Sequence, residues 1–285
     1  MENVFHGIRS ALRRGDLNGI LRRTGRLPAL AGQVPCFTLS FDCETEEDLE
    51  ALPEILDALA AFRIPAAFAC IGIWIERFPE IHREILKKGH EILNHSHTHP
   101  YHEILNQGRQ FKDLSLEEKA EEIAQCHRIC GQALDYSPSG FRTPHFGINH
   151  SEELYPVLRK LGYRFSSSTV VDTSGKGSGP SLTPTGIVEI PLGTSARYPG
   201  ALFDTWNFLD SDKAICRDPA DFTAILAESI VQLVRQKGYL TYYFDPSALT
   251  RRGILRQVLS ILSPKPGLRH IPYGTIANLV RERSS

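Results

Sequence analysis

Three histidines at alternating positions are the residues best suited to chemistry in this sequence. His95, His97 and His99 lie in the segment NHSHTHP, residues 94–100, directly after a short apolar run. Each imidazole carries two polar nitrogens that need partners, so such a triplet is rare in a core. His95 and His99 share a face in a helical turn, and all three share one in an extended segment. Two imidazoles can therefore converge on one divalent cation, although a satisfied, partly exposed histidine cluster is the alternative.

Two carboxylates follow the first predicted strand. Residues 36–41 form a β-rich apolar run, after which Asp42 and Glu44 point the same way if the strand continues. A metal-dependent hydrolase needs a further ligand and a base that takes a proton from water. One of the two carboxylates could bind the cation while the other acts as the base. The acidic residues 46–48 are interpreted as the solvated first turn of the next helix.

Two more polar residues follow predicted strands. Arg142 comes after a short strand near residues 140–142, and Asp245 follows the apolar run 239–244. In a parallel barrel, the carboxyl ends of the strands open on one face, which holds the active site. A surface ion pair is the alternative for either residue taken singly. Their shared position at strand ends with Asp42 and His95 favours a common site.

The elements that must position these residues alternate between strand and helix. Alternation of this kind implies a mainly parallel sheet. Seven or eight such units in 285 residues predict an α/β barrel of seven or eight parallel strands in a single domain. The loops 173–186 and 198–217 are too long for this scheme and are expected to be functional or disordered. Helices are expected at 48–62, 79–89, from 115, at 221–237 and up to 262, and further strands at 66–71, 91–94, 164–167 and 187–191.

Composition narrows the possible partners and location. Lys plus Arg number 32 against 33 Asp plus Glu, and this balance argues against nucleic acid as a partner. The six cysteines form no CxxC pair and are expected to be reduced. Neither a signal-peptide pattern nor a bilayer-spanning apolar stretch is visible, so we expect a cytoplasmic protein.

The first 34 residues are expected to form an N-terminal amphipathic arm, followed by the barrel domain over residues 35–285. Residues 5–23 contain an apolar stripe with interspersed arginines. A basic amphipathic helix of this kind can make peripheral contact with an anionic membrane. Packing of the helix on the outside of the domain is the alternative interpretation and the favoured one.

Over residues 35–280 the sequence resembles the polysaccharide deacetylases, the carbohydrate esterases with a NodB homology domain. The resemblance is carried by SFDCE (residues 40–44), HSHTHP (95–100) and Arg-Thr-Pro (142–144). It implies a distorted (β/α) TIM-like barrel with one divalent metal ion, bound by two histidines and an acidic residue. It also implies a neighbouring aspartate that acts as general base.

Carried over to this chain, the resemblance makes His95, His99 and Glu44 the metal ligands and Asp42 the base, held by Arg142. Zinc is the first expectation for the metal. In the family branch with adjacent aspartates, the ligand position falls on Cys43, and a thiolate ligand stays a minor alternative.

The sequence departs from the family pattern at the proton donor. The family's last motif usually supplies a histidine, and Asp245 occupies that position here. A carboxyl group can donate a proton only if its surroundings keep it protonated. If they do not, His145 or another loop residue must serve. The family's aspartate and tryptophan near residues 166–168 are also missing.

The expected substrate is an N-acetyl or N-formyl amino sugar in a polysaccharide precursor or a lipid-linked sugar. Pro144, His145 and Trp206 are predicted to contact it. Aromatic residues of the loop 198–217 could stack on sugars or anchor the loop to the core, and both interpretations stay open. The alternative functions are a metal-free amidohydrolase resembling allantoinases and a non-catalytic carbohydrate-binding barrel.

Overall fold

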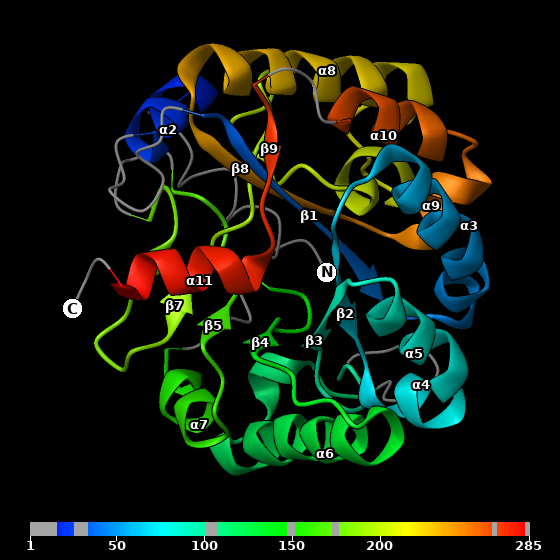
Figure 1. The fold of residues 1–285 in the computed structure, drawn as a ribbon, viewed down its shortest axis with the longest axis vertical. Helices are drawn as coiled ribbons and strands as arrows, with labels where there is room; N and C mark the ends of the chain where they lie inside the picture. Colours follow the sequence, from blue (N-terminus) through cyan, green and yellow to red (C-terminus); the bar gives the residue numbers. More distant parts are fainter. Residues whose placement is uncertain are drawn as a thin grey trace.

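One curled, mostly parallel sheet organises the molecule. The computed structural model describes residues 16–25, 34–100, 108–146, 152–172, 177–263 and 267–282. The strand order is β6-β7-β5-β4-β3-β2-β1-β8, and only the β6–β7 pair is antiparallel, while the short β9 pairs with the start of β1 (Figure 1). The strands are β1 (Cys36–Cys43), β2 (Ala67–Cys70), β3 (Glu91–Asn94), β4 (Gly140–Phe141), β5 (Phe165–Ser166), β6 (Ser181–Leu182), β7 (Val188–Glu189), β8 (Tyr239–Phe244) and β9 (Arg269–His270).

Helices surround the strands, which confirms the predicted α/β barrel architecture (Figure 1). Every residue of β1 is buried, as expected for a parallel strand covered on both faces. The helices are α2 (Leu17–Thr24), α3 (Glu46–Phe62), α4 (Gly72–Arg77), α5 (Pro79–Lys87), α6 (Leu116–Leu134), α7 (Leu154–Lys160), α8 (Pro219–Gln236), α9 (Pro246–Arg251), α10 (Leu255–Leu262) and α11 (Tyr273–Glu282); shorter turns are η2 (Phe111–Asp113) and the π-helical η3 (Trp206–Asp210).

Local sequence signals explain where several helices begin. At the start of α6, Glu118 N–H donates to Ser115 Oγ and Ser115 N–H donates to Glu118 Oε2, at 3.2 and 2.7 Å. This reciprocal pair is the predicted capping box. Pro79 occupies the first position of α5, where its missing N–H costs no helical hydrogen bond. The starts of α5 and α6 therefore follow from local signals in the sequence.

A glycine brings the two ends of the curled sheet together. The Gly193 N–H donates to the carbonyl oxygen of Thr241 in β8 at 2.8 Å. A Cβ atom at position 193 would lie 2.8 Å from that oxygen and 2.7 Å from Leu240 Cδ1. Only glycine allows this approach, which joins the segment after β7 to β8 and narrows the gap in the barrel.

Helix α2 packs on the barrel against α8. Its apolar residues Leu17, Ile20 and Leu21 are at most 1% exposed. Protein therefore covers this half of the apolar stripe, which agrees with the favoured interpretation that the helix packs on the outside of the domain. Residues 5–15, the other half of the stripe, lie outside the described residues. In the part of the chain that is described, no helix has the length and apolar character needed to cross a membrane.

Candidate metal centre

Three ligand-type side chains from two strand ends meet at one point. Glu44 follows β1, and His95 and His99 follow β3. The Nε2 atoms of His95 and His99 lie 3.1 and 3.2 Å from the same atom, Oε1 of Glu44. Candidate ligand atoms of all three lie within 4.8 Å of one another. Both imidazoles are buried, whereas 29% of the Glu44 side chain is exposed, so the cluster can be reached from solvent.

The hydrogen bonds of His95 fit a divalent cation. Its Nδ1 lies 2.8 Å from the carbonyl oxygen of Arg142, a contact that requires an N–H at Nδ1. In the neutral ring, Nε2 then carries a lone pair that faces Glu44 Oε1. Two facing acceptors need either a second ring proton or a cation between them. Metal-binding histidines usually donate their other N–H to a carbonyl or carboxylate, so the donor set matches a metal site.

The ionisation state of Glu44 also suits an anionic ligand. Burial raises the pKa of this carboxyl group, but the charges and hydrogen bonds of His99 and His95 outweigh burial. The pKa of Glu44 therefore lies well below its ordinary value. A carboxylate at this position can balance part of a cation's charge.

The histidine segment is neither a helical turn nor an extended strand. Ser96 and His99 have positive φ angles of 66° and 50°, which occur neither in a right-handed helical turn nor in an extended strand. His97 points away from the cluster, and its Nε2 lies 2.9 Å from Nε2 of Gln125 in α6. The irregular loop therefore separates His97 from the two candidate ligands.

A buried ion pair lies next to the three ligand-type residues. Arg142 follows β4 and donates from Nη1 to Oδ1 of Asp42, and neither side chain is exposed. Arg142 also donates to Ser167 and to the hydroxyl group of Tyr273 at 2.8 Å. The other oxygen of Asp42, Oδ2, is buried and has no hydrogen-bond partner among the described residues. Asp42 therefore has one oxygen held and one available to a reactant.

The tip of β1 is fixed by Asp48, which the sequence interpretation placed in a solvated helix turn. That interpretation is wrong for Asp48, which is 3% exposed. Its Oδ2 accepts the N–H groups of Glu44 and Thr45, both at 3.1 Å, because the capping box of α3 needs this contact. Cys43 is fully buried and is not one of the three clustered residues, so the geometry favours Glu44 over Cys43 as a ligand.

Asp245 follows β8 next to the tip of β1. The parallel register pairs Phe41 with Phe244, so Asp42 and Asp245 leave neighbouring strands at the same level. Thr205 Oγ donates to Asp245 Oδ2 at 2.6 Å and accepts the Asp245 N–H at 2.8 Å. Burial, together with the charges of Asp48 and Glu44, raises the pKa of Asp245 well above its ordinary value. The site surroundings therefore favour a protonated carboxyl group.

The three residues predicted to contact substrate lie in different surroundings. His145 is exposed, and its ring centre lies 4.6 Å from that of His99, while Pro144 is buried. Trp206 is 57% exposed at the start of η3. Phe203 and Phe208 are fully buried, so these two anchor the loop to the core and do not line a sugar wall. Trp206 has the largest exposed fraction of the aromatic side chains in this loop and so stays a candidate for substrate contact.

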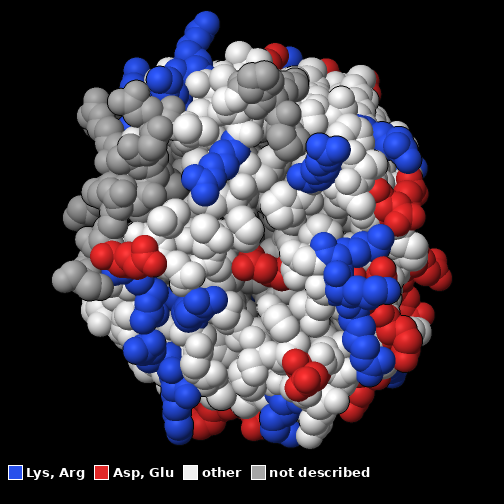
Figure 2. All heavy atoms as spheres, viewed as in Figure 1, with Lys and Arg blue, Asp and Glu red and all other residues white. Residues whose placement is uncertain are grey.

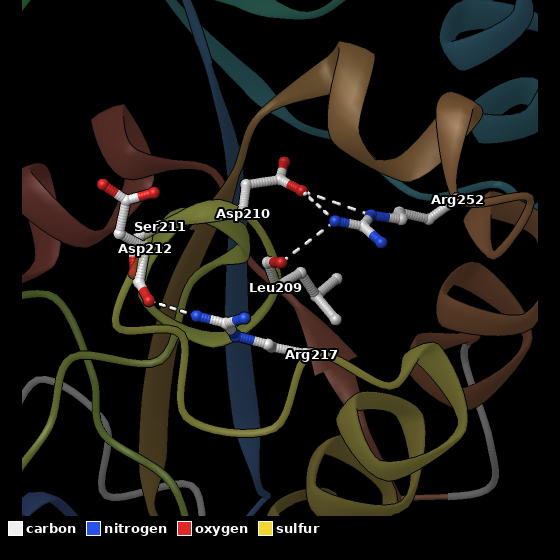
Figure 3. Close-up of a pocket in the computed structure, with 6 residues that line it drawn as sticks. All are labelled: Leu209, Asp210, Ser211, Asp212, Arg217 and Arg252. Carbon is white, nitrogen blue, oxygen red and sulfur yellow. Dashed lines mark hydrogen bonds and ion pairs between the residues drawn. The ribbon is translucent and has the colours of Figure 1, made fainter.

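A separate surface hollow lies beside η3. Its lining consists of Leu209, Asp210, Ser211, Asp212, Arg217 and Arg252 (Figure 3). Arg252 donates to Asp210 Oδ1 at 2.8 Å, and Arg251 donates to Asp210 Oδ2 at 2.7 Å. None of the predicted site residues lines this hollow. The convergence of chemical groups, and not this depression, therefore defines the candidate site.

The face of the molecule shown in Figure 2 carries charges of both signs. Acidic and basic side chains are interspersed there, without a continuous basic area among the residues drawn in colour (Figure 2). The chain has a formal net charge of −1.

The sequence did not identify several residues that shape the site. Asp204 is fully buried, and its carboxylate accepts the backbone N–H and side-chain NH₂ of Asn207 at 2.7 and 2.6 Å. Tyr273 reaches Arg142 from α11, far along the chain. Asp204 and Tyr273 have no local signal in the sequence. For Asp48, the Thr-x-x-Asp spacing from Thr45 could have indicated a capping box.

Comparison with known proteins identifies related sequences and folds. A family profile described as polysaccharide deacetylase matches residues 31–166. A chitooligosaccharide deacetylase of Bradyrhizobium sp. (strain ANU 289) is 36% identical over 100 residues, which cover 33% of this chain and 39% of that protein. A peptidoglycan-N-acetylglucosamine deacetylase of Bacillus cereus is 32% identical over 98 residues, covering 34% of this chain and 32% of that protein.

A solved structure extends the fold comparison beyond these matched segments. A Mycobacterium smegmatis protein assigned to the polysaccharide deacetylases superposes with a TM-score of 0.73 at 17% identity, over 88% of this chain and 92% of that one. The chain thus shares its fold with that protein, while it spans only about a third of the length of the two curated relatives.

Proposed function

We propose that the protein is a metal-dependent hydrolase that removes an N-acyl group from an amino sugar, because its residues 31–166 match the polysaccharide deacetylase family profile. The observation that carries the proposal is the convergence of Glu44, His95 and His99 beside the buried Asp42–Arg142 pair. An amide is a poor electrophile, so its hydrolysis needs carbonyl polarisation, a base for water and an acid for the leaving nitrogen.

The three clustered residues would hold one divalent cation, with zinc as the first expectation. Two histidines and one carboxylate are a known ligand set of catalytic zinc sites, which leave a coordination position open. When bound, such a cation supplies the Lewis acidity that polarises an amide carbonyl and lowers the pKa of water. Glu44 contributes negative charge, and the Arg142 carbonyl fixes the orientation of the His95 ring.

Asp42 is proposed as the base that takes a proton from the attacking water. Arg142 fixes one of its carboxylate oxygens, and the buried Oδ2 is available to accept the proton. Burial raises the pKa of Asp42 despite the opposing charge of Arg142, which makes the carboxylate a better proton acceptor.

Asp245 is proposed as the acid that protonates the leaving nitrogen. Its position at the end of β8 places it beside Asp42, and Thr205 orients the carboxyl group. Burial and the neighbouring charges of Asp48 and Glu44 raise the pKa of Asp245 well above its ordinary value, which suits a proton donor. A separate acid and base in different surroundings is the usual solution for this kind of chemistry.

The proposed substrate is an N-acetylglucosamine-type sugar, because the two curated relatives are named for chitooligosaccharide and peptidoglycan deacetylation. Polysaccharide precursors and lipid-linked sugars stay within this proposal, as does a formyl in place of an acetyl group. Trp206 and His145 are the proposed sugar contacts, and a cytoplasmic location stays a prediction.

Amine release from a substrate panel, measured together with metal content, tests the proposal. We expect stoichiometric zinc or a similar ion in the purified protein and free amine from at least one N-acyl sugar. Asp42→Asn is expected to abolish turnover and to keep the metal. Replacing both His95 and His99 by alanine is expected to remove both metal and turnover.

His97→Ala is the matched control, because His97 lies in the same loop but contacts Gln125 on α6. It is expected to keep the metal and most of the activity. Full activity of Asp42→Asn, or full metal content after loss of both candidate histidine ligands, would reject the assignment.

A non-catalytic sugar-binding barrel is the second candidate, favoured by Asp245 in place of the histidine expected at that position. Sugar binding without amine release across the panel would support it, and restoration of activity by Asp245→His would identify the missing group. Metal analysis of the purified protein separates the metal-free amidohydrolase from the main proposal, because stoichiometric zinc or a similar ion would exclude it.

A further inference from the structure

The loop that carries His95 and His99 has a strained backbone. Ser96 and His99 adopt positive φ angles of 66° and 50° without being glycine. For residues with a Cβ atom, this left-handed conformation is sterically unfavourable. Such a conformation persists only where the surrounding structure holds it in place. The loop therefore needs contacts from outside itself to keep two imidazoles converged.

Each backbone N–H from residue 95 to residue 99 has a defined acceptor. His95 N–H donates to the Cys70 carbonyl at 3.1 Å, Ser96 N–H to Asn94 Oδ1 at 2.8 Å, and His99 N–H to Ser96 Oγ at 3.0 Å. These three acceptors belong to β2, to β3 or to the loop itself. The remaining two N–H groups lie in the middle of the loop, where no strand reaches them.

Glu122 of α6 binds the middle of the loop with both carboxylate oxygens. Its Oε2 accepts the N–H groups of His97 and Thr98 at 2.9 and 2.8 Å, and its Oε1 accepts the Thr98 hydroxyl at 2.8 Å. Hydrogen bonds to an ionised carboxylate are about twice as strong as neutral ones. No candidate metal ligand is among the three groups that Glu122 binds, so it acts on the loop and not on the cation.

We infer that Glu122 is a positioning residue that sets the affinity of the metal centre. By binding both central N–H groups, it holds His95 and His99 in a converged arrangement before a cation arrives. Without Glu122, the loop can relax from the strained conformation. The free energy of metal binding is then less favourable, because the conformation must be restored when the metal binds. The inference rests on the proposed metal-dependent function.

Zinc affinity of the full chain, measured by chelator competition, tests this role in the metal-depleted protein. Glu122→Gln keeps the side-chain shape but replaces one acceptor by an NH₂ donor that faces N–H and O–H donors. Losses of outer contacts at metal sites typically weaken metal binding about 10- to 100-fold, and we expect a loss in this range. Activity at saturating zinc should fall much less than affinity, because the ligands are unchanged.

Glu121→Gln is the matched control. Glu121 is the preceding residue of the same helix, and its carboxylate pairs with Arg128 at 2.8 Å on the surface. This variant removes the same charge from α6 and is expected to leave zinc affinity unchanged. Thr98→Val, which removes only the hydroxyl contact, is expected to give a smaller loss and serves if Glu122→Gln does not fold.

The outcomes separate this inference from the proposed function. If the unmodified protein binds no divalent cation, the metal-dependent function fails. If it binds zinc while Glu122→Gln, or Thr98→Val where the first does not fold, binds zinc equally well, only the role of Glu122 is overturned. A lower unfolding temperature of the metal-free variant with unchanged zinc affinity also overturns it, because the contact is then merely structural.

Discussion

The Asp42–Arg142 pair gives a prediction in which the two partners should behave unequally. Both side chains are fully buried. Asp42→Asn leaves the Arg142 guanidinium with the neutral acceptors of Ser167 and Tyr273. Removing one partner of a buried ion pair typically destabilises a protein by about 3–5 kcal/mol. Arginine cannot lose its proton near neutral pH, so we expect the full penalty for this variant.

Arg142→Met should cost less, because the remaining partner can become neutral. Burial already raises the pKa of Asp42, and loss of the Arg142 charge removes the main opposing influence. Asp42 can then take up a proton, so the penalty of Arg142→Met should shrink as pH falls. Combining both substitutions removes both buried charges and should cost less than the sum of the single changes.

Urea denaturation of the four proteins at pH 5 and pH 8 measures these differences. The free energy of unfolding is obtained from the midpoint and the m-value, and an unchanged m-value excludes a change in the unfolding reaction. Additive penalties that are equal for the two single variants and independent of pH would refute the reasoning. Such a result would mean that the pair is effectively hydrated and carries no buried charge.

Three further predictions concern residues away from the candidate ligands. Burial raises the pKa of Asp204 to about 7 from the unfolded value of 3.8. The protein should therefore lose up to about 4 kcal/mol of stability as pH rises from 4 through 7, because the buried carboxyl group must give up its proton. Asp204→Asn should abolish this loss, so its urea midpoint should change less between pH 5 and pH 8 than that of the unmodified protein. Burial and the charge of Lys88 lower the pKa of His90 to about 4. The neutral ring stabilises the fold above pH 6.5, and this effect is lost as pH falls through 4. In thermal unfolding, His90→Gln should therefore lose less stability between pH 6 and pH 4 than the unmodified protein does. Gly193→Ala would place a methyl group 2.7 Å from Leu240 Cδ1 and should lower the free energy of unfolding by about 1–3 kcal/mol; an unchanged unfolding temperature would show that the barrel seam can open without cost.

The strand ends that carry the site could be predicted because each has a local signal. The run 239–244 becomes β8 with the predicted bounds, and the polar residue that follows it, Asp245, lies at the predicted level. Residues 91–94 become β3 in the same way. Parallel strands covered on both faces read as continuous apolar runs, so the point where such a run ends is visible in a sequence.

The contacts that orient the site could not be predicted, because they depend on distant segments. Tyr273 reaches Arg142 from more than a hundred residues away, and Glu122 reaches the histidine loop from α6. Each looks like an ordinary helix residue in the sequence. The loop conformation at Ser96 and His99 was also hidden, because neither residue is a glycine.

The candidate site therefore divides into groups that are proposed to react and groups that hold them. Asp42 lies at the end of β1, Glu44 follows β1 and His95 follows β3; the strand register fixes their level but not the direction of their side chains. Direction comes from hydrogen bonds by Asp48 at the β1 tip and by the Arg142 carbonyl at the His95 ring. A chain that kept the strand-end residues but lost these contacts would still match the family motifs, yet its ligands would need to be reorganised for each cation. For this reason, metal affinity measures the integrity of the site more directly than the presence of its motifs.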